Sequence, residues 1–184
     1  MAEEIAPKRL QLLHELVPVS SRIGVLFNPS DTSLQAVITD AAAAASAMGL
    51  KIESLPAAND HEIDAAFASL MDKQIDALLV YPSLFFFERR EQLITLAARH
   101  AVPAIYFDRP FAQAGGLMSY GTDFSDMYRQ VGRYIGRIFN GEQAADLPVV
   151  RLTKFDFVIN LRAARQLGIE VPQELLAKAS EVIE

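Results

Sequence analysis

Apolar residues along the first two thirds of the chain fall into two alternating patterns. Short continuous apolar runs bounded by turn residues are typical of buried strands, and apolar residues at helical spacing are typical of amphipathic helices. The strand pattern occurs at 22–27, 51–55, 77–81 and 104–107, and the helix pattern at 7–16, 33–48, 61–73 and 88–100. Strands that alternate with helices in this way form right-handed βαβ units. The chain is therefore predicted to be α/β, with a parallel sheet covered by helices on both faces.

The last third is less regular, because two glycines at 115 and 116 interrupt the chain before a short strand expected at 117–120. Asp123 or Ser125 is expected to cap a helix that ends near Asn140, as Asp60 is expected to cap the helix at 61–73. The remaining expected elements are an extended segment at 148–152, a strand at 155–159 and helices at 161–167 and 173–180.

The formal net charge of −6 and the lack of cysteine narrow the possible functions. Nucleic-acid binding calls for clustered lysine and arginine, so an acidic chain argues against that partner. Without cysteine there is no disulfide, thiolate metal site or cysteine nucleophile. The apolar runs are far shorter than the roughly 20 residues of a spanning helix. The first ten residues lack the apolar segment of a signal peptide, so the chain is expected to be cytoplasmic if it is the whole product.

The sequence motifs of common enzyme classes do not occur in this chain. It contains no G-x-S-x-G elbow, no P-loop and no H-E-x-x-H. The first predicted strand leads into Asn28 and Pro29 rather than into a glycine-rich loop. His14, His61 and His100 do not have metal-ligand spacing. We therefore expect a protein that is not an enzyme and that uses no metal and no cofactor.

Candidate binding residues follow from a rule for open parallel sheets, in which ligands bind beyond the carboxyl ends of the strands. The rule selects the loops at 28–33, 57–60, 81–83 and 108–110. The first of these loops is the most polar, and free backbone N–H groups at the helix that follows it favour a carboxylate or a phosphate. Asp31 could instead pair with an ammonium group. Ordinary helix capping is the alternative for each of these polar side chains.

Three consecutive phenylalanines, 85–87, follow the third predicted strand. Three adjacent aromatic side chains cannot all face one core. One or two of them could line a ligand cleft or an interface, and burial under the neighbouring helix is an equal alternative.

Five segments in a fixed order carry a resemblance that covers nearly the whole chain. They are KRLQLLHELVP at 8–18, RIGVLFNPSD at 22–31, ALLVYP at 77–82, AGGLMSYG at 114–121 and TKFDFVINL at 153–161. Together they resemble a bacterial family of ABC transporter substrate-binding proteins, some of whose members resemble binders of aromatic amino acids. The resemblance implies the type I periplasmic-binding fold, in which two Rossmann-like lobes joined by three crossovers close on a ligand by a hinge motion.

The resemblance covers the C-terminal portion of such a protein, so the N-terminal lobe is expected to be largely missing. Residues 1–117 and 148–184 are then the ligand-binding lobe, a Rossmann-like three-layer unit. Residues 118–147 are the hinge return and a helix that would pack on the missing lobe. That helix is strongly apolar, so we expect it to pack in another way on the visible domain or on a second copy of the chain, as a homodimer.

The resemblance also assigns ligand-binding positions at the selected strand ends. The first loop contributes Asn28, Asp31, Thr32 and Ser33, the third and fourth strand ends contribute Ser83 and Asp108, and the hinge return contributes Ser119 and Tyr120. Asp31 or Asp108 is expected to meet a ligand ammonium group, and Ser33 with the adjacent backbone is expected to meet a carboxylate.

The function expected from this resemblance is that of a solute-binding component of an ABC import system, which binds an amino acid and docks on a permease. Such a protein is periplasmic or lipid-anchored. A ligand-sensing domain of a regulator is the first alternative, although the sequence shows no DNA-binding or output segment. A truncated fragment without independent binding is the second alternative. An enzyme of the doubly wound class is the third, and the missing motifs argue against it.

Overall fold

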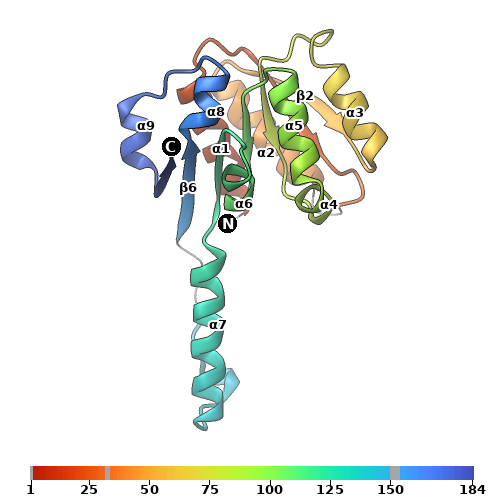
Figure 1. Ribbon diagram of the computed structural model, residues 1–184. Helices are drawn as coiled ribbons and strands as arrows, with labels where there is room; N and C mark the ends of the chain where they lie inside the picture. The colour runs from red at the N-terminus through yellow and green to blue at the C-terminus, as the bar shows by residue number, and fades with distance from the viewer. Residues whose placement is uncertain (1, 32–33, 150–153) are drawn as a thin grey trace.

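The computed structural model describes residues 2–31, 34–149 and 154–184. Within these ranges the chain forms one sheet flanked by helices (Figure 1). The strand order in the sheet is β2-β1-β3-β4-β5-β6-β7. The strands are β1 Arg22–Phe27, β2 Lys51–Pro56, β3 Ala77–Val80, β4 Ala104–Tyr106, β5 Met118–Thr122, β6 Phe155–Asn160 and β7 Glu181–Ile183. The helices are α1 Ala2–Leu16, α2 Leu34–Ala47, α3 Asp60–Ala68, α4 Leu84–Glu88, α5 Arg90–Arg99, α6 Arg109–Gln113, α7 Phe124–Phe139, α8 Leu161–Gln166 and α9 Gln173–Lys178. A short 3-10 helix spans Ala144–Asp146. None of the described helices is both long and apolar enough to cross a membrane.

Two apolar cores lie on the two faces of the sheet. On β3, Ala77 and Leu79 belong to one core, while Leu78 and Val80 belong to the other. The first core joins the sheet to α1, α2, α8 and α9, and the second joins it to α3, α4, α5 and α6. Because both faces are covered, the central strands need apolar residues at every position. This three-layer arrangement confirms the α/β lobe expected from the sequence.

The sheet changes direction at β6, and this change determines which residues share its edge. Strands β1 to β5 run parallel, so they all end at the same edge. Strand β6 is antiparallel to β5 and pairs Asp156 with Gly121, so β6 begins at that edge. A Cβ atom on Gly121 would lie 2.0 Å from the carbonyl oxygen of Phe107. Glycine is required here, because the backbone of Phe107 and Asp108 lies too close to leave room for a side chain.

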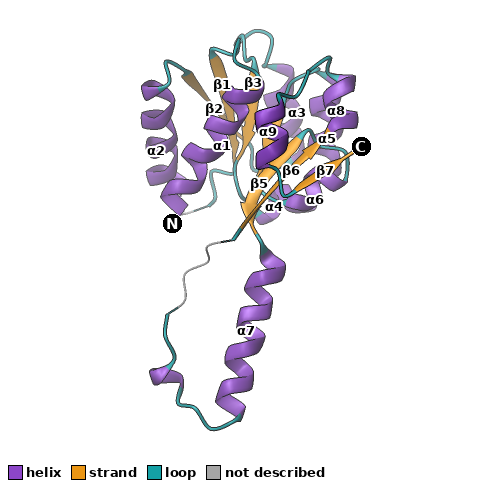
Figure 2. Cartoon of the chain, turned by 90° about the vertical axis from the view of Figure 1, so that its left-hand side faces the viewer, coloured by secondary structure: helices purple, strands orange, loops and turns teal. Residues whose placement is uncertain are grey.

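Helix α7 leaves this edge and projects away from the rest of the lobe (Figure 2). Asp123 caps it by accepting a hydrogen bond from the backbone N–H of Asp126 at 2.9 Å. The Tyr134 hydroxyl donates to the carbonyl oxygen of Pro148 at 2.5 Å, which links the helix to the returning segment. Its exposed large apolar residues are Phe124, Tyr128, Val131, Ile135, Ile138 and Phe139. The alternative in which this helix folds back on the visible domain is therefore wrong, and a partner from outside this lobe stays a prediction.

Most predicted elements are confirmed within a few residues, and the differences have local causes. Asn59, not Asp60, caps α3, because the Asn59 side chain accepts a hydrogen bond from the backbone N–H of Glu62. The helix expected at 88–100 is α5, which begins at Arg90 after a break at Arg89. Helices α4 and α6 and strand β7 were not predicted, because each is too short to show a periodic apolar pattern. The extended segment expected at 148–152 lies largely outside the described residues.

Candidate functional site

The strand-end loops selected from the sequence meet at the carboxyl edge of the sheet. Asp31, Ser83 and Asp108 line one open cavity of about 510 Å³. The other lining residues are Pro82, Leu84, Phe87, Phe107 and Phe124. A few polar groups beside a largely apolar, aromatic wall are typical of sites for small organic molecules.

Asn28 shapes the first loop from a position outside this cavity. Its Oδ1 accepts a hydrogen bond from the backbone N–H of Ser30 at 2.9 Å, which is the arrangement of an Asx turn. Thr32 and Ser33 lie outside the described residues. The contact expected between Ser33 and a ligand carboxylate therefore stays a prediction.

Two polar atoms beside the cavity have no hydrogen-bond partner within the described part of the chain. They are Ser83 Oγ and Asp31 Oδ2. Ser83 is only 8% exposed, and it precedes α4 without capping it. Most buried polar groups in proteins are hydrogen-bonded. Two unpartnered oxygens next to a cavity therefore favour a ligand that supplies the missing donors.

A second open cavity, of about 470 Å³, adjoins the first, and Asp108 lines both. Its lining residues are Leu84, Phe87, Asp108, Arg109, Pro110, Thr122, Phe124, Ser125, Tyr128 and Asp156. Asp108 caps α6 by accepting a hydrogen bond from the backbone N–H of Arg109 at 2.8 Å. Burial raises the pKa of Asp108 above its ordinary value. The hydrogen bond from the Arg109 backbone and the charge of Arg9 act to lower this pKa, and the negative charge of Asp156 acts to raise it.

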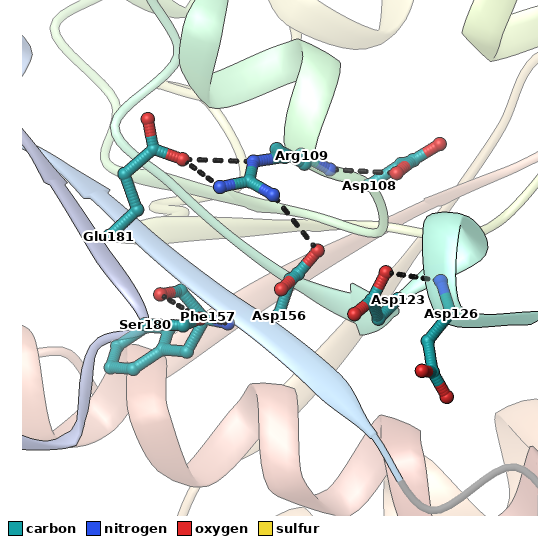
Figure 3. A network of polar contacts seen from close by, with 8 residues as sticks. All are labelled: Asp108, Arg109, Asp123, Asp126, Asp156, Phe157, Ser180 and Glu181. Carbon is teal, nitrogen blue, oxygen red and sulfur yellow. Dashed lines mark hydrogen bonds and ion pairs between the residues drawn. The ribbon is translucent and has the colours of Figure 1, made fainter. Parts of the chain in front are cut away.

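Arg109 connects α6 to the two C-terminal strands (Figure 3). Its Nε donates to Glu181 on β7 at 2.8 Å, and its Nη2 contacts the same carboxylate oxygen. Its Nη1 lies 3.4 Å from Asp156 Oδ2 on β6. Burial raises the pKa of Asp156; Arg109 opposes this, and Asp123 and Glu181 reinforce it. One guanidinium thus serves several carboxylates, so this end of the site has an excess of negative charge.

Arg9 lies beneath the same edge and is 4% exposed. Its Nε donates to the carbonyl oxygen of Tyr120 at 2.6 Å, and its Nη2 donates to the carbonyl oxygen of Phe107 at 3.4 Å. Burial lowers the pKa of Arg9 to about 10, while Tyr81, Tyr120 and Asp108 act to raise it. The guanidinium therefore stays charged at neutral pH. Its two hydrogen bonds hold the ends of β4 and β5 in place.

Ser119 and Tyr120 lie in β5 and line neither cavity. Ser119 is fully buried, and its Oγ has no hydrogen-bond partner among the residues described. The Tyr120 ring stacks on Phe155, with 5.6 Å between the ring centroids. The structure thus brings Asp31, Ser83 and Asp108 together but leaves Ser119 and Tyr120 out of both cavities, and their contact with a ligand stays a prediction.

Sequence reasoning missed Arg9, Asp156, Phe124 and Tyr128. Arg9 occupies an apparently ordinary position in an amphipathic helix. Asp156 reaches the edge only because β6 is antiparallel, and strand direction cannot be read from an isolated apolar run. A usable signal existed for Phe124, because it follows a helix cap close to a strand end, as binding residues in this fold class often do.

The comparison with protein families gives the class to which this lobe belongs. A family model described as ABC transporter substrate binding protein matches residues 2–183. The chain belongs to this family. The match includes the lobe and α7, so the family expected from the sequence is confirmed.

Relatives of this substrate-binding protein support the fold over nearly its whole length. A tyrosine-binding protein of Clostridioides difficile is 22% identical over 163 residues, which are 89% of this chain and 47% of that protein. An ABC domain from Streptococcus pneumonia, crystallised in complex with L-Trp, is 25% identical with a TM-score of 0.83, over 97% of this chain and 62% of that chain. A conserved domain protein of Vibrio cholerae has the same TM-score of 0.83 at 24% identity, over 96% and 60% of the two chains.

The comparisons cover nearly all of this chain but only part of each relative. This substrate-binding protein spans about half the length of the curated relative and about three fifths of the solved chains. Its family consists of solute-binding proteins rather than enzymes. The ligand and the transport partner are therefore proposed below from the chemistry of the site.

Proposed function

We propose that the chain supplies one wall of an amino-acid-binding site in an ABC import system. The observation that carries this proposal is the cavity in which Asp31, Ser83 and Asp108 lie beside Phe87 and Phe124. A carboxylate can pair with an α-ammonium group, and an aromatic wall can cover an apolar side chain. Unpartnered oxygens at Asp31 and Ser83 are acceptors that a bound solute can satisfy with its own donors.

Two relatives agree with this chemistry, since one is a tyrosine-binding protein and another was crystallised with L-Trp. In the two-lobed fold, the other lobe covers the ligand from the opposite side.

Membership of the family also suggests where the protein works. We propose that the chain acts outside the cytoplasm, like its family, and that it delivers its solute to a permease.

Binding can be tested by thermal unfolding of the chain with L-tyrosine, L-tryptophan and L-leucine. A ligand at about 100 times its Kd stabilises the folded state by about 2.7 kcal/mol. For a domain of this size, that raises Tm by about 5–10 °C. Asp108→Asn should reduce the shift, because it removes the charge that faces the ammonium group.

Asp72→Asn is the matched control, since Asp72 is exposed and lies outside both cavities. Equal shifts in the two variants would contradict the role of Asp108. No shift with any of the three amino acids would contradict amino-acid binding by this chain and would favour the alternative of a fragment without independent binding.

We also propose that α7 pairs with α7 of a second copy. Beyond the two residues that line the cavity, its exposed apolar residues Val131, Ile135 and Ile138 are spaced by four and three residues. This spacing is the seam of a two-stranded coiled coil. An exposed seam of this length is stabilised by pairing, because pairing removes its apolar surface from water.

A further inference from the structure

The cavity between α6, β6 and the first turn of α7 contains the carboxylate of Asp156. The nearest cation, Arg109, makes closer contacts with Glu181 than with Asp156. The side chain of Asp156 is 17% exposed, and its contact with Arg109 Nη1 is long, at 3.4 Å. Arg109 directs Nε and Nη2 to Glu181 instead. The charge of Asp156 is therefore only partly balanced by the residues around it.

Charged residues from four elements act on the two carboxylates of this cavity. Asp108 and Arg109 come from the start of α6, Asp123 from the start of α7 and Glu181 from β7, while Arg9 lies beneath on α1. The single exposed cation in this set, Arg109, already serves Glu181. A positively charged group that enters the cavity would meet Asp108 and Asp156 together.

The walls of this cavity suit an organic cation. Phe87, Phe124 and Tyr128 line it together with the two carboxylates. Aromatic faces attract ammonium groups, and the attraction strengthens when water is excluded. A further observation is independent of the carboxylates. Ser83 lines the adjoining cavity, is more than nine-tenths buried, and has an Oγ without a partner among the described residues.

We propose that Asp156, together with Asp108, forms the subsite for the ligand's ammonium group, and that Arg109 positions Asp156 while Glu181 holds Arg109 in place. This inference rests on the proposed amino-acid binding and names the second carboxylate of that site. It makes the start of α7 part of the site, because Phe124 and Tyr128 line the same cavity as the two carboxylates.

The positioning role of Glu181 follows from the same geometry. While Glu181 binds two nitrogens of Arg109, the guanidinium is kept from forming a close bidentate pair with Asp156. If Glu181 loses its charge, Arg109 is free to move onto Asp156 and to neutralise it. Glu181→Gln should therefore weaken ammonium binding without removing either carboxylate of the subsite.

The test compares each amino acid with its deaminated analogue, in which a hydrogen atom replaces the ammonium group. Affinities of L-tyrosine, L-tryptophan and L-leucine and of the three analogues are measured by titration calorimetry on the wild-type chain and on Asp156→Asn. We expect Asp156→Asn to weaken the amino acids roughly tenfold, as for a partly exposed charge pair. The affinities of the analogues should stay unchanged or rise, because they carry no cation.

Three outcomes are distinguishable. If the amino acids weaken and the analogues do not, Asp156 meets the ammonium group. If both series weaken equally, or neither changes, the subsite is overturned while wild-type binding still supports the proposed function. If the wild-type chain binds none of the amino acids, the proposed function fails and the subsite fails with it.

Two further variants distinguish direct contact between Asp156 and the ammonium group from an effect of Asp156 on protein stability. Asp72→Asn removes an equivalent charge from an exposed position outside the cavity and should leave every affinity unchanged. Asp156→Glu keeps the charge and should recover part of the preference for the amino acids over their analogues. A purely structural role for Asp156 would instead show a loss that follows protein stability and is the same for both ligand series.

Discussion

Arg9 lies among apolar neighbours on α1, and its side chain is almost completely covered. No carboxylate lies within ion-pair distance of it in the described part of the chain; its recorded partners are two backbone carbonyl oxygens, on Phe107 and Tyr120. These carbonyls belong to the ends of β4 and β5, next to Asp108 and the start of α7. One buried side chain therefore fixes the two strand ends on which the candidate site is built.

Replacing Arg9 with alanine should lower the free energy of unfolding by about 2–4 kcal/mol, because a charged donor to two carbonyls is lost and a cavity is left. Urea denaturation followed by circular dichroism measures this change. Arg99→Ala, at an exposed position in the last turn of α5, should change stability by less than about 0.5 kcal/mol. Similar values for the two variants would show that Arg9 does not hold the strand ends.

Helix α7 is the element whose surroundings differ most from those of an ordinary surface helix. It is strongly amphipathic, yet its apolar face is exposed and the helix stands away from the sheet (Figure 1). Asp126 near its start is covered locally by Arg129, Gln130 and Lys154, and hydrogen bonds from Gln130 and Lys154 lower the pKa of Asp126. The first turn is thus held by polar contacts, while the large apolar residues along the rest of the helix stay exposed.

We expect the chain to sediment as a dimer at micromolar concentration if α7 pairs with a second copy. Ile135→Asp should shift it to a monomer, because a carboxylate in the middle of the seam would be desolvated on pairing. Arg133→Asp places the same side chain on the same helix away from the seam and should leave the dimer intact. A compact wild-type monomer at this concentration would contradict pairing through α7.

At the scale of the whole molecule, the sheet edge has acidic groups that cost stability. Burial raises the pKa of Asp108 and of Asp156, so each is protonated more easily in the folded protein than in the unfolded chain. Asp76 behaves in the opposite way. Burial acts to raise the pKa of Asp76, but hydrogen bonds from Ser21 and Arg22 outweigh it and lower the pKa. Carboxylates that destabilise the folded state at a cavity, beside carboxylates that stabilise it elsewhere, are expected when the cavity serves binding rather than stability.

The two kinds of carboxylate predict opposite dependences of stability on pH. A raised pKa means that stability is lost as the pH rises through it, so Asp108→Asn should raise Tm at pH 7, and the gain should vanish below about pH 4. A lowered pKa means that stability is present at neutral pH and lost on acidification. Asp76→Asn should therefore lower Tm at pH 7, with a smaller effect as the pH falls. Thermal scans of both variants from neutral to acidic pH check the two signs, and a fall in Tm for Asp108→Asn at pH 7 would contradict the first.

The alternation of apolar runs and amphipathic stretches by itself determined the α/β class, four parallel strands and the loops at their carboxyl ends. This worked because burial on both faces of a sheet requires continuous apolar strands, a local property of the sequence. The same rule selected Asp31, Ser83 and Asp108, which the structure brings to one cavity.

Only the tertiary structure decided the rest of the site. Asp156 reaches the edge through an antiparallel pairing, and the side chain of Arg109 is held by Glu181, which is 72 residues away in sequence. Arg9 is covered because α1 packs over the ends of β4 and β5, and α7 is exposed because nothing in the described lobe covers it. Strand direction, burial of a charge and the partner of a helix face all depend on distant parts of the chain, so no local pattern encodes them.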